Sequence, residues 1–332
     1  MAEIAIIGAG AWGTALSIVL ARKGHGVRLW AYEQDVFRAM REQRENTKFL
    51  PGHKLPLEIR PASDPAEALE HAEIVIWATP SNYSRALLRS LKAALPPHAA
   101  IVSATKGIEN ESLLRMTEVI AAELDNQNEV AALSGPSFAQ EVARGDPTAV
   151  TVAGNNSDLS KRLQCEFSGP TFRVYTSDDV IGVELGGALK NVIAIAAGVC
   201  DGLGLGHNTI AALITRGLAE ITRLAVACSA RRETLAGLSG MGDLVLTCTG
   251  GLSRNRSVGV ELGRGRKLGE IIAGMHGMVA EGVLTTNAAI GLARKHGIEM
   301  PISEQMHAIL QQGKDPRHAI QELMGRPGRG EA

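Results

Sequence analysis

Short apolar runs alternate with longer segments of helical periodicity through the first half of the chain. Short aliphatic runs between turn residues are typical of buried strands, whereas apolar residues about three or four positions apart are typical of helices. Strands that alternate with helices indicate an α/β domain with a parallel-rich sheet. The predicted strands are Ile4–Ile7, Val27–Trp30, Ile74–Trp77, Ala99–Ser103, Val130–Leu133, Ala149–Val152 and Phe172–Tyr175. The predicted helices between them include Trp12–Lys23, Ser84–Ala94 and Leu113–Leu124.

The pattern changes near Asp178, where segments rich in Ala, Leu and Gly follow one another with helical spacing. Of the 37 glycines, 11 lie in residues 1–180 and 26 lie after residue 180. Each glycine costs a helix roughly 1 kcal/mol, so we expect close helix packing to compensate. We therefore predict an α/β domain over residues 1–179 and an all-α domain over residues 180–332. The predicted helices of the second domain include Gly186–Gly198, Ile210–Cys228, Val258–Leu262 and Thr285–Lys295.

Composition narrows the class of protein further. The 332 residues are 45% apolar and 21% charged, which is typical of a globular protein. Lys and Arg number 34 against 35 Asp and Glu, so the chain has no positive field for nucleic acid. The longest apolar run, around Val192–Cys200, is too short to span a membrane. The start, Met1–Gly8, lacks the features of a signal peptide, and we expect a cytoplasmic protein.

The cysteines give no sign of a metal centre or a disulfide framework. Four of them, Cys165, Cys200, Cys228 and Cys248, form no CxxC pair and have no histidine at metal-ligand spacing. We expect free thiols in a reducing compartment, and we assign no metal to this protein.

A glycine-rich turn follows the first predicted strand and opens the first helix. Its glycines are Gly8, Gly10 and Gly13, in the GxGxxG arrangement that lets backbone N–H groups approach a pyrophosphate. A second strand follows, and then Glu33, at the place where a carboxylate binds a ribose 2′-hydroxyl. This context predicts a Rossmann-like dinucleotide site. Glu33 favours NAD, whereas the nearby Arg38 and Arg41 suit the 2′-phosphate of NADP, so the preference stays open.

Polar residues also follow other predicted strands, at the sheet edge where ligands of open α/β folds bind. The three junctions are Ala78–Ser81, Ser103–Gly107 and Ser134–Ser137. Lys106 has no opposite charge within two residues and precedes Gly107, so its ammonium is free to point into the crevice. A solvated loop lysine is the alternative.

The segment Glu184–Gly198 predicts a helix with little polar surface on any side, and such a helix should be buried. Burial of Lys190 would lower its pKa toward a value suited to proton transfer. The alternatives are a lysine that reaches the surface or pairs with Glu184. Asp243, in a glycine turn, is placed to orient an ammonium group. The donors of Ser253–Ser257 precede a helix and suit a dianionic phosphate, although a solvated basic loop has the same composition.

Six segments together make the chain resemble the bacterial NAD(P)-dependent sn-glycerol-3-phosphate dehydrogenases over nearly its whole length. The GALKN and SRNRS blocks among them are far more specific than the glycine fingerprint. The segments are Gly8–Ser17, Ala104–Glu109, Leu133–Val142, Val183–Thr209, Gly237–Gly259 and Val279–Thr286.

The resemblance implies a Rossmann-like domain, a helical substrate domain, and a role for each matched residue. Lys190 would be the general acid/base at the C2 oxygen of the substrate, in a site assembled with Lys106 and Asp243. The implied substrate contacts are Lys106, Gly135, Ser137, Lys190, Asp243, Ser253, Arg254 and Asn255, with Arg254 and Asn255 at the phosphate. The expected cofactor contacts are Gly8, Gly10, Ala11, Trp12, Gly13, Lys106, Ala139, Arg254, Val279 and Glu281.

The implied reaction is the reversible, NAD(P)H-linked reduction of dihydroxyacetone phosphate to sn-glycerol 3-phosphate, which supplies glycerophospholipid synthesis. Homodimers are common in the family, but this sequence gives no independent indication of one. Ala11 stands where many members have serine, and Ala31–Glu33 lacks the arginine that some members have there. Both departures concern the choice between NAD and NADP.

Two other functions fit parts of this pattern. A β-hydroxyacid dehydrogenase would also use a helix-borne lysine, but it would act on a carboxylate substrate and would not need the donors of Ser253–Asn255. A nucleotide-sensing protein would use the glycine turn without turnover and would need no buried lysine. Phosphate dependence and turnover distinguish these alternatives.

Overall fold

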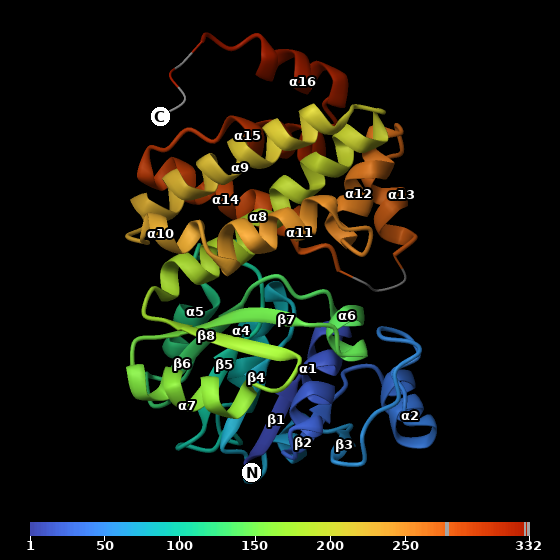
Figure 1. The fold of residues 1–332 in the computed structure, drawn as a ribbon, viewed down its shortest axis with the longest axis vertical. Coiled ribbons are helices and arrows are strands. Elements are labelled where there is room, and N and C mark those ends of the chain that lie inside the picture. Colours follow the sequence, from blue (N-terminus) through green and yellow to red (C-terminus); the bar gives the residue numbers. More distant parts are fainter. Residues whose placement is uncertain (276–278, 329, 331–332) are drawn as a thin grey trace.

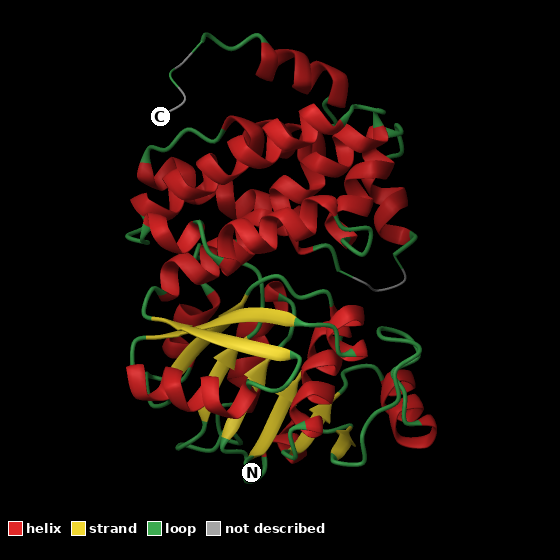
Figure 2. Ribbon diagram, viewed as in Figure 1, coloured by secondary structure: helices red, strands yellow, loops and turns green. Residues whose placement is uncertain are grey.

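The structure is a computed structural model that describes residues 1–275, 279–328 and 330. An eight-stranded sheet flanked by helices forms one end of the molecule, and a layered group of helices forms the other (Figures 1 and 2). The strands are β1 (Glu3–Ile7), β2 (Gly26–Trp30), β3 (Ile59–Ala62), β4 (Ile74–Trp77), β5 (Ala100–Ser103), β6 (Val130–Ser134), β7 (Thr148–Gly154) and β8 (Phe172–Ser177). All seven predicted strands are present, and β3 is an eighth.

The strand order is β3-β2-β1-β4-β5-β6-β7-β8. Neighbouring strands are parallel except β6 and β7, which pair antiparallel. The exception arises because the short connection through α6 (Ala139–Arg144) returns the chain from the same edge of the sheet. The first six strands have the order of a dinucleotide-binding sheet, with its switch point between β1 and β4.

Strand residues alternate between two cores, which explains why the runs are apolar throughout. Ile4 and Ile6 of β1 face one core, and Ala5 and Ile7 face the other. The first core is covered by α1 (Ala11–Arg22), α6 and α7 (Ser157–Phe167), and α2 (Gln34–Gln43) packs at its margin. The second is covered by α3 (Pro65–Leu69), α4 (Ser81–Leu91) and α5 (Met116–Glu123).

The rest of the described chain is helical, as the sequence predicts. The longest helix, α8, is buried along nearly its whole length. It is long and apolar enough to cross a membrane, but 94% of its most apolar window is buried inside the protein, which makes it a core helix. The elements are α8 (Val180–Gly202), α9 (His207–Ala227), α10 (Arg232–Leu235), the π-helical turn η1 (Leu238–Gly242), α11 (Asp243–Thr249), α12 (Arg254–Gly263), α13 (Leu268–Ala273), α14 (Glu281–His296), α15 (Pro301–Gln312) and α16 (Pro316–Met324).

Glycines let α8 and α12 approach at backbone distance. A Cβ atom on Gly198 would overlap the carbonyl oxygen of Arg256, and one on Gly259 would overlap that of Ile195. The expectation that the glycine-rich helices pack closely is therefore confirmed. The contact fixes α12, and with it Ser253–Asn255, against the C-terminal half of α8.

The helices lie over the sheet edge at which β1, β4, β5 and β6 end (Figure 1). Val180 and Val183, in the first turns of α8, pack against Ala132 of β6 and Ala153 of β7. The middle of α8 then passes this edge, where the loops that follow the strands meet it. The candidate residues from both halves of the chain converge there.

Candidate active site

The glycine turn after β1 forms a cradle at the N-terminus of α1. Gly8 has φ +119°, and a Cβ atom on it would lie 2.7 Å from the carbonyl oxygen of Ala78. Gly13 is packed against the carbonyl of Gly8, whereas Gly10 has open space in front of it. No side chain caps α1, so its first N–H groups are free to bind an anion. These residues fit the pyrophosphate of a dinucleotide.

The other residues expected at the cofactor lie around this turn. Ala11 is buried at the first position of α1, and Trp12 follows it, half-buried. Within the described chain the indole Nε1 of Trp12 has no hydrogen-bond partner. Glu33 is half-buried directly before α2, and Ala139 is half-buried at the start of α6.

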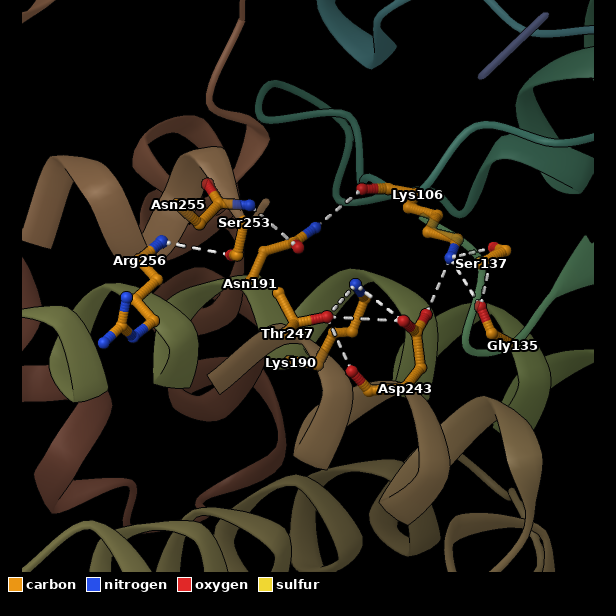
Figure 3. Close-up of polar contacts among 10 residues, drawn as sticks. All are labelled: Lys106, Gly135, Ser137, Lys190, Asn191, Asp243, Thr247, Ser253, Asn255 and Arg256. Atoms are coloured by element: carbon orange, nitrogen blue, oxygen red, sulfur yellow. Dashed lines mark hydrogen bonds and ion pairs between the residues drawn. The ribbon is translucent and has the colours of Figure 1, made fainter. Parts of the chain in front are cut away.

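Two lysines from different halves of the chain share the carboxylate of Asp243 (Figure 3). Lys190 Nζ lies 2.9 Å from Asp243 Oδ1 and donates to Thr247 Oγ1 at 2.7 Å. Lys106 Nζ lies 2.7 Å from Asp243 Oδ2 and donates to the carbonyl of Gly135 at 2.8 Å. It also contacts Ser137 Oγ at 3.2 Å. The structure thus brings together five of the residues expected at the substrate.

The site is dry and carries an excess of positive charge. Asp243 is 1% exposed and Lys190 is 5% exposed. Burial, assisted by repulsion from Lys190, lowers the pKa of Lys106 to about 8, although Asp243 acts in the opposite direction. Two ammonium groups on one carboxylate leave a net positive charge, which stabilises an oxyanion in a low-dielectric site.

Local structure fixes each of these groups. Lys190 lies in the middle of α8, and Asp243 is the first residue of α11. Thr247, one turn later, donates to the Asp243 carbonyl at 2.6 Å and presents its oxygen to Lys190. Gly135 has φ +139°, and a Cβ atom there would lie 2.9 Å from Val150 Cα. Only glycine therefore turns its carbonyl toward Lys106 without strain.

Neither alternative position of Lys190 is observed. Its side chain does not reach the surface, and Glu184 binds elsewhere. The Glu184 carboxylate accepts from Arg115 Nη1 at 2.5 Å and from Thr117 N at 2.8 Å. Burial raises the pKa of Glu184, while Arg115 and Thr117 oppose that rise. Glu184 therefore joins α8 to α5, and Lys190 forms its ion pair with Asp243 instead.

A chain of amides crosses the site beside the lysines (Figure 3). Asn191 Nδ2 donates to the Lys106 carbonyl at 3.3 Å, and Asn255 Nδ2 donates to Asn191 Oδ1 at 2.9 Å. Gly282 N, in the first turn of α14, donates to Asn255 Oδ1 at 3.0 Å. An amide nitrogen carries two hydrogens, so Asn255 keeps one N–H for a ligand.

The donors of Ser253–Ser257 divide into two kinds. Ser253 Oγ caps α12 by accepting from Arg256 N at 3.2 Å, and the Arg256 guanidinium pairs with Asp201 at 3.0 Å. Arg254 is half-buried, and no described residue forms an ion pair or hydrogen bond with its guanidinium. Burial alone lowers the pKa of Arg254. A guanidinium without a counterion at a helix N-terminus is suited to a phosphate.

Glu281, expected at the cofactor, joins the two halves of the molecule. It is the first residue of α14, and its carboxylate accepts from Ser81 Oγ at 2.8 Å and from Ser81 N at 3.2 Å. Burial raises the pKa of Glu281, and the bonds from Ser81 oppose that rise. Val279 is half-buried just before α14. Gly107, next to Lys106, packs against both Ser81 and Glu281.

Sequence reasoning missed Thr247 and Asn191. Thr247 follows Asp243 by four residues on a helix, a spacing that places both on one face. Asn191 directly follows Lys190.

Within residues 1–275, 279–328 and 330, no group of three or more His, Cys, Asp or Glu side chains is placed to bind a metal ion.

The chain matches two sequence models of one family. Residues 3–160 match the model described as NAD-dependent glycerol-3-phosphate dehydrogenase N-terminus, and residues 179–321 match the corresponding C-terminus. The chain belongs to the NAD-dependent glycerol-3-phosphate dehydrogenase family.

Individual members of the family are similar over their full length. A glycerol-3-phosphate dehydrogenase (NAD(P)+) from Koribacter versatilis is 62% identical over 330 residues, which cover 98% of each chain. One from Acidobacterium capsulatum is 55% identical over 338 residues and the whole of both chains. The crystal structure of glycerol-3-phosphate dehydrogenase from Coxiella burnetii matches with a TM-score of 0.94 at 45% identity, over 98% of this chain and 99% of that one.

These matches confirm several predictions. The family is the one that the motifs indicate, and the Rossmann-like domain followed by a helical domain is its fold. As a glycerol-3-phosphate dehydrogenase family member, the chain is an NAD(P)-dependent oxidoreductase. The roles of individual residues and the division at 179/180 remain predictions.

Proposed function

We propose that this protein interconverts dihydroxyacetone phosphate and sn-glycerol 3-phosphate, using NADH or NADPH for the reduction. The product is the backbone precursor of glycerophospholipids. The observation that supports this function most strongly is the buried cluster of Lys190, Lys106 and Asp243. The neighbouring helix α12, joined to α8 by the Asn255–Asn191 hydrogen bond, begins with Arg254, whose guanidinium pairs with no described residue. A carbonyl reductase for a phosphorylated ketone needs these two features together.

The lysine cluster performs the proton chemistry. The ketone oxygen at C2 lies against Lys190 Nζ and takes a proton from it as the carbon–oxygen double bond becomes single. Asp243 and Thr247 fix the direction of the Lys190 ammonium. The ammonium of Lys106 adds a second positive charge against the developing oxyanion, which lowers the barrier in a site without bulk water.

Arg254 and Asn255 bind the phosphate, which the reaction leaves unchanged. Their contribution is orientation, because binding energy from a non-reacting group positions the carbonyl against Lys190. Ser253 supports them as the cap of α12. Gly135 and Ser137 complete the substrate pocket next to Lys106.

The glycine turn Gly8–Gly13 binds the dinucleotide pyrophosphate at the N-terminus of α1. The reduced nicotinamide, when bound, supplies the hydride that adds to C2. Ala139, at the start of α6, and Val279 and Glu281, at the start of α14, are the further residues assigned to the dinucleotide.

The proposal also covers the domain organisation and the setting of the enzyme. Residues 1–179 bind the dinucleotide, and residues 180–332 supply Lys190, Asp243 and the phosphate site. Residues 276–278, 329, 331 and 332 lie outside the described part of this second domain. The sequence supports a cytoplasmic location for this proposal, and only the family resemblance supports a homodimer.

The test is a spectrophotometric assay of the purified protein. With NADH or NADPH and dihydroxyacetone phosphate, we expect oxidation that depends on the ketone, and we expect little with dihydroxyacetone, which lacks the phosphate. Equal rates with both ketones would contradict the role of Arg254. If neither cofactor is oxidised, the proposed reaction is wrong. Cofactor binding without turnover on a panel of phosphorylated and carboxylate ketones would favour a nucleotide sensor.

A further inference from the structure

Asn46 is a fully buried polar residue outside the motifs that the proposed function uses. Its side chain is 0% exposed, in the segment between α2 and β3. Asn46 Nδ2 donates to the carbonyl of Ala9 at 2.8 Å and to Thr14 Oγ1 at 2.9 Å. Its Oδ1 accepts from Phe49 N at 3.0 Å. Asn46 therefore joins this segment to the glycine turn, from behind the turn.

The bond to Ala9 determines the direction of a second group. Every peptide bond in the described chain is trans, so the C=O of Ala9 and the N–H of Gly10 point in opposite directions from one peptide plane. Asn46 keeps the carbonyl turned into the protein. The N–H of Gly10 therefore points away from Asn46. The space beside Gly10 is open as well, since a Cβ on Gly10 would meet nothing within 4 Å. No hydrogen bond within the described chain uses this N–H.

Without Asn46, this peptide plane has little to fix it. Glycine at position 10 accepts many backbone angles, so the plane is free to rotate. Among the described residues, the only other side chain that bonds to the Ala9 carbonyl is Thr14, whose hydroxyl donates to it at 3.4 Å. A rotated peptide would present a carbonyl oxygen to the ligand in place of an N–H. Asn46 disfavours the rotated conformation in the free protein. Such preorganisation raises the affinity of the turn for the dinucleotide.

We propose that Asn46 is a positioning residue for the cofactor: it fixes the Ala9–Gly10 peptide so that the Gly10 N–H faces the dinucleotide pyrophosphate. This inference rests on the proposed function, because it requires that the glycine turn binds NAD(P)H. Asn46 itself does not touch the ligand. Its effect belongs to cofactor affinity and not to the chemical step at Lys190.

The chain offers a matched control in Asn128. Asn128 Nδ2 also donates to two backbone carbonyls, those of Pro96 at 3.1 Å and Ala99 at 2.9 Å. These contacts lie where β5 and β6 begin, at the sheet edge opposite the glycine turn. Loss of either asparagine costs hydrogen bonds to backbone, but only Asn46 contacts the turn.

The experiment compares Asn46→Asp and Asn46→Ala with Asn128→Asp and Asn128→Ala in the full-length protein. Asn46→Asp keeps the acceptor for Phe49 N and loses the donors, whereas Asn46→Ala loses both without adding charge. Dissociation constants for NADH and NADPH are measured by nucleotide fluorescence, and kcat is measured at saturating cofactor. We expect both Asn46 variants to raise the Kd at least about tenfold, with kcat within about threefold of the wild type. Both Asn128 variants should keep the wild-type Kd.

Two results would overturn the inference: wild-type affinity in the folded Asn46 variants, or an equal loss of affinity in the Asn128 variants. The second result would mean that general destabilisation weakens cofactor binding. Failure of the wild-type protein to bind either nucleotide would instead reject the proposed function. Binding by the wild type with unaltered Asn46 variants rejects only the role of Asn46.

Discussion

At the scale of single residues, the site depends on one carboxylate that serves two ammonium groups. Asp243 contacts Lys106 with one oxygen and Lys190 with the other. Three buried charges of this kind are costly to desolvate, and each is tolerated only because it has a partner. The charges sum to +1, and an oxyanion formed beside Lys190 neutralises that excess. The charges of the site therefore favour the developing oxyanion of the transition state over the neutral ketone.

The lowered pKa of Lys106 predicts the pH dependence of the reaction. Below pH 8 Lys106 is protonated and contributes its charge, and above its pKa of about 8 the charge is lost. We expect kcat/KM for dihydroxyacetone phosphate to fall as the pH rises through that value, because at saturating cofactor kcat/KM reports the groups of the enzyme–cofactor complex to which the ketone binds. The measurement is a pH profile from 6 to about 10 at saturating cofactor.

The control for this profile is Lys106→Arg. A guanidinium stays protonated throughout that range, so the decline near pH 8 should be absent from the variant, whatever its absolute rate. An unchanged decline in Lys106→Arg would assign the titration to another group. A flat wild-type profile would show that the charge of Lys106 does not matter for the reaction.

The sequence predicted only some of the residues that form the site. Lys190 stands out because a charged residue within an apolar helix is rare, and Lys106 stands out because it lies just after a predicted strand. Asp243 is the carboxylate of a glycine turn. Thr247 and Asn46 are ordinary polar residues, and their importance comes from contacts that only the fold creates. Asn46 contacts Ala9 across 37 residues of chain, and no local pattern encodes that distance.

At the scale of secondary-structure elements, buried strands with continuous apolar sequence were predictable and edge elements were not. β3 was missed because Ile59–Ala62 contains Arg60 and Pro61 and resembles a loop. Proline has no N–H to donate and is tolerated because β3 is an edge strand. The helix α2 did carry a signal, since Val36, Ala39 and Met40 lie at helical spacing and are buried.

The contact between α8 and α12 explains why a helix-rich region contains so many glycines. Gly198 and Gly202 of α8 face Gly259 and Gly263 of α12, so the two backbones touch. What each glycine costs in helix propensity is offset by packing, as the sequence predicted in general terms. The sequence did not show which glycines pair, because that depends on the crossing of two helices.

Substitution of one of these glycines tests the packing. Gly198→Ala places a methyl group into the Arg256 carbonyl, and we expect the free energy of unfolding to fall by about 1–3 kcal/mol, the usual cost of overpacking. The matched control is Gly269→Ala in α13, where an added Cβ would meet nothing within 4 Å. This control should be neutral or more stable by up to about 1 kcal/mol, from helix propensity. Urea denaturation measures both, and equal stability of Gly198→Ala and the wild type would contradict the packing argument.

At the scale of the whole molecule, the site exists only where the two halves meet. Lys106, Gly135 and Ser137 follow strands of the sheet, whereas Lys190 and Asp243 belong to the helical part. Three further contacts join the halves beside the site: Arg115 with Glu184, Ser81 with Glu281, and Asn191 with the Lys106 carbonyl. The shared interface places a cofactor bound at the glycine turn next to a substrate bound at α12.

This convergence is also what the sequence could not provide alone. Lys106 and Asp243 are 137 residues apart, and their meeting depends on how α8 passes the edge of the sheet. The family resemblance placed these residues in one site because it carried information from other folded proteins, and in the structure their side chains are in contact. The structure adds the distances and the burial, from which the charges of the site can be argued.

The central claim is that the ammonium of Lys190 protonates the ketone oxygen, and the most direct test is the rate of a single turnover. Pre-bound NADH or NADPH is mixed with saturating dihydroxyacetone phosphate, and the loss of nicotinamide absorbance is followed for the wild type, Lys190→Ala and Lys190→Met. Lys190→Met keeps the volume of the side chain. We predict that both variants bind the cofactor with near wild-type affinity and react at least about a hundredfold more slowly. Single-turnover rates close to the wild type in either variant would contradict the account.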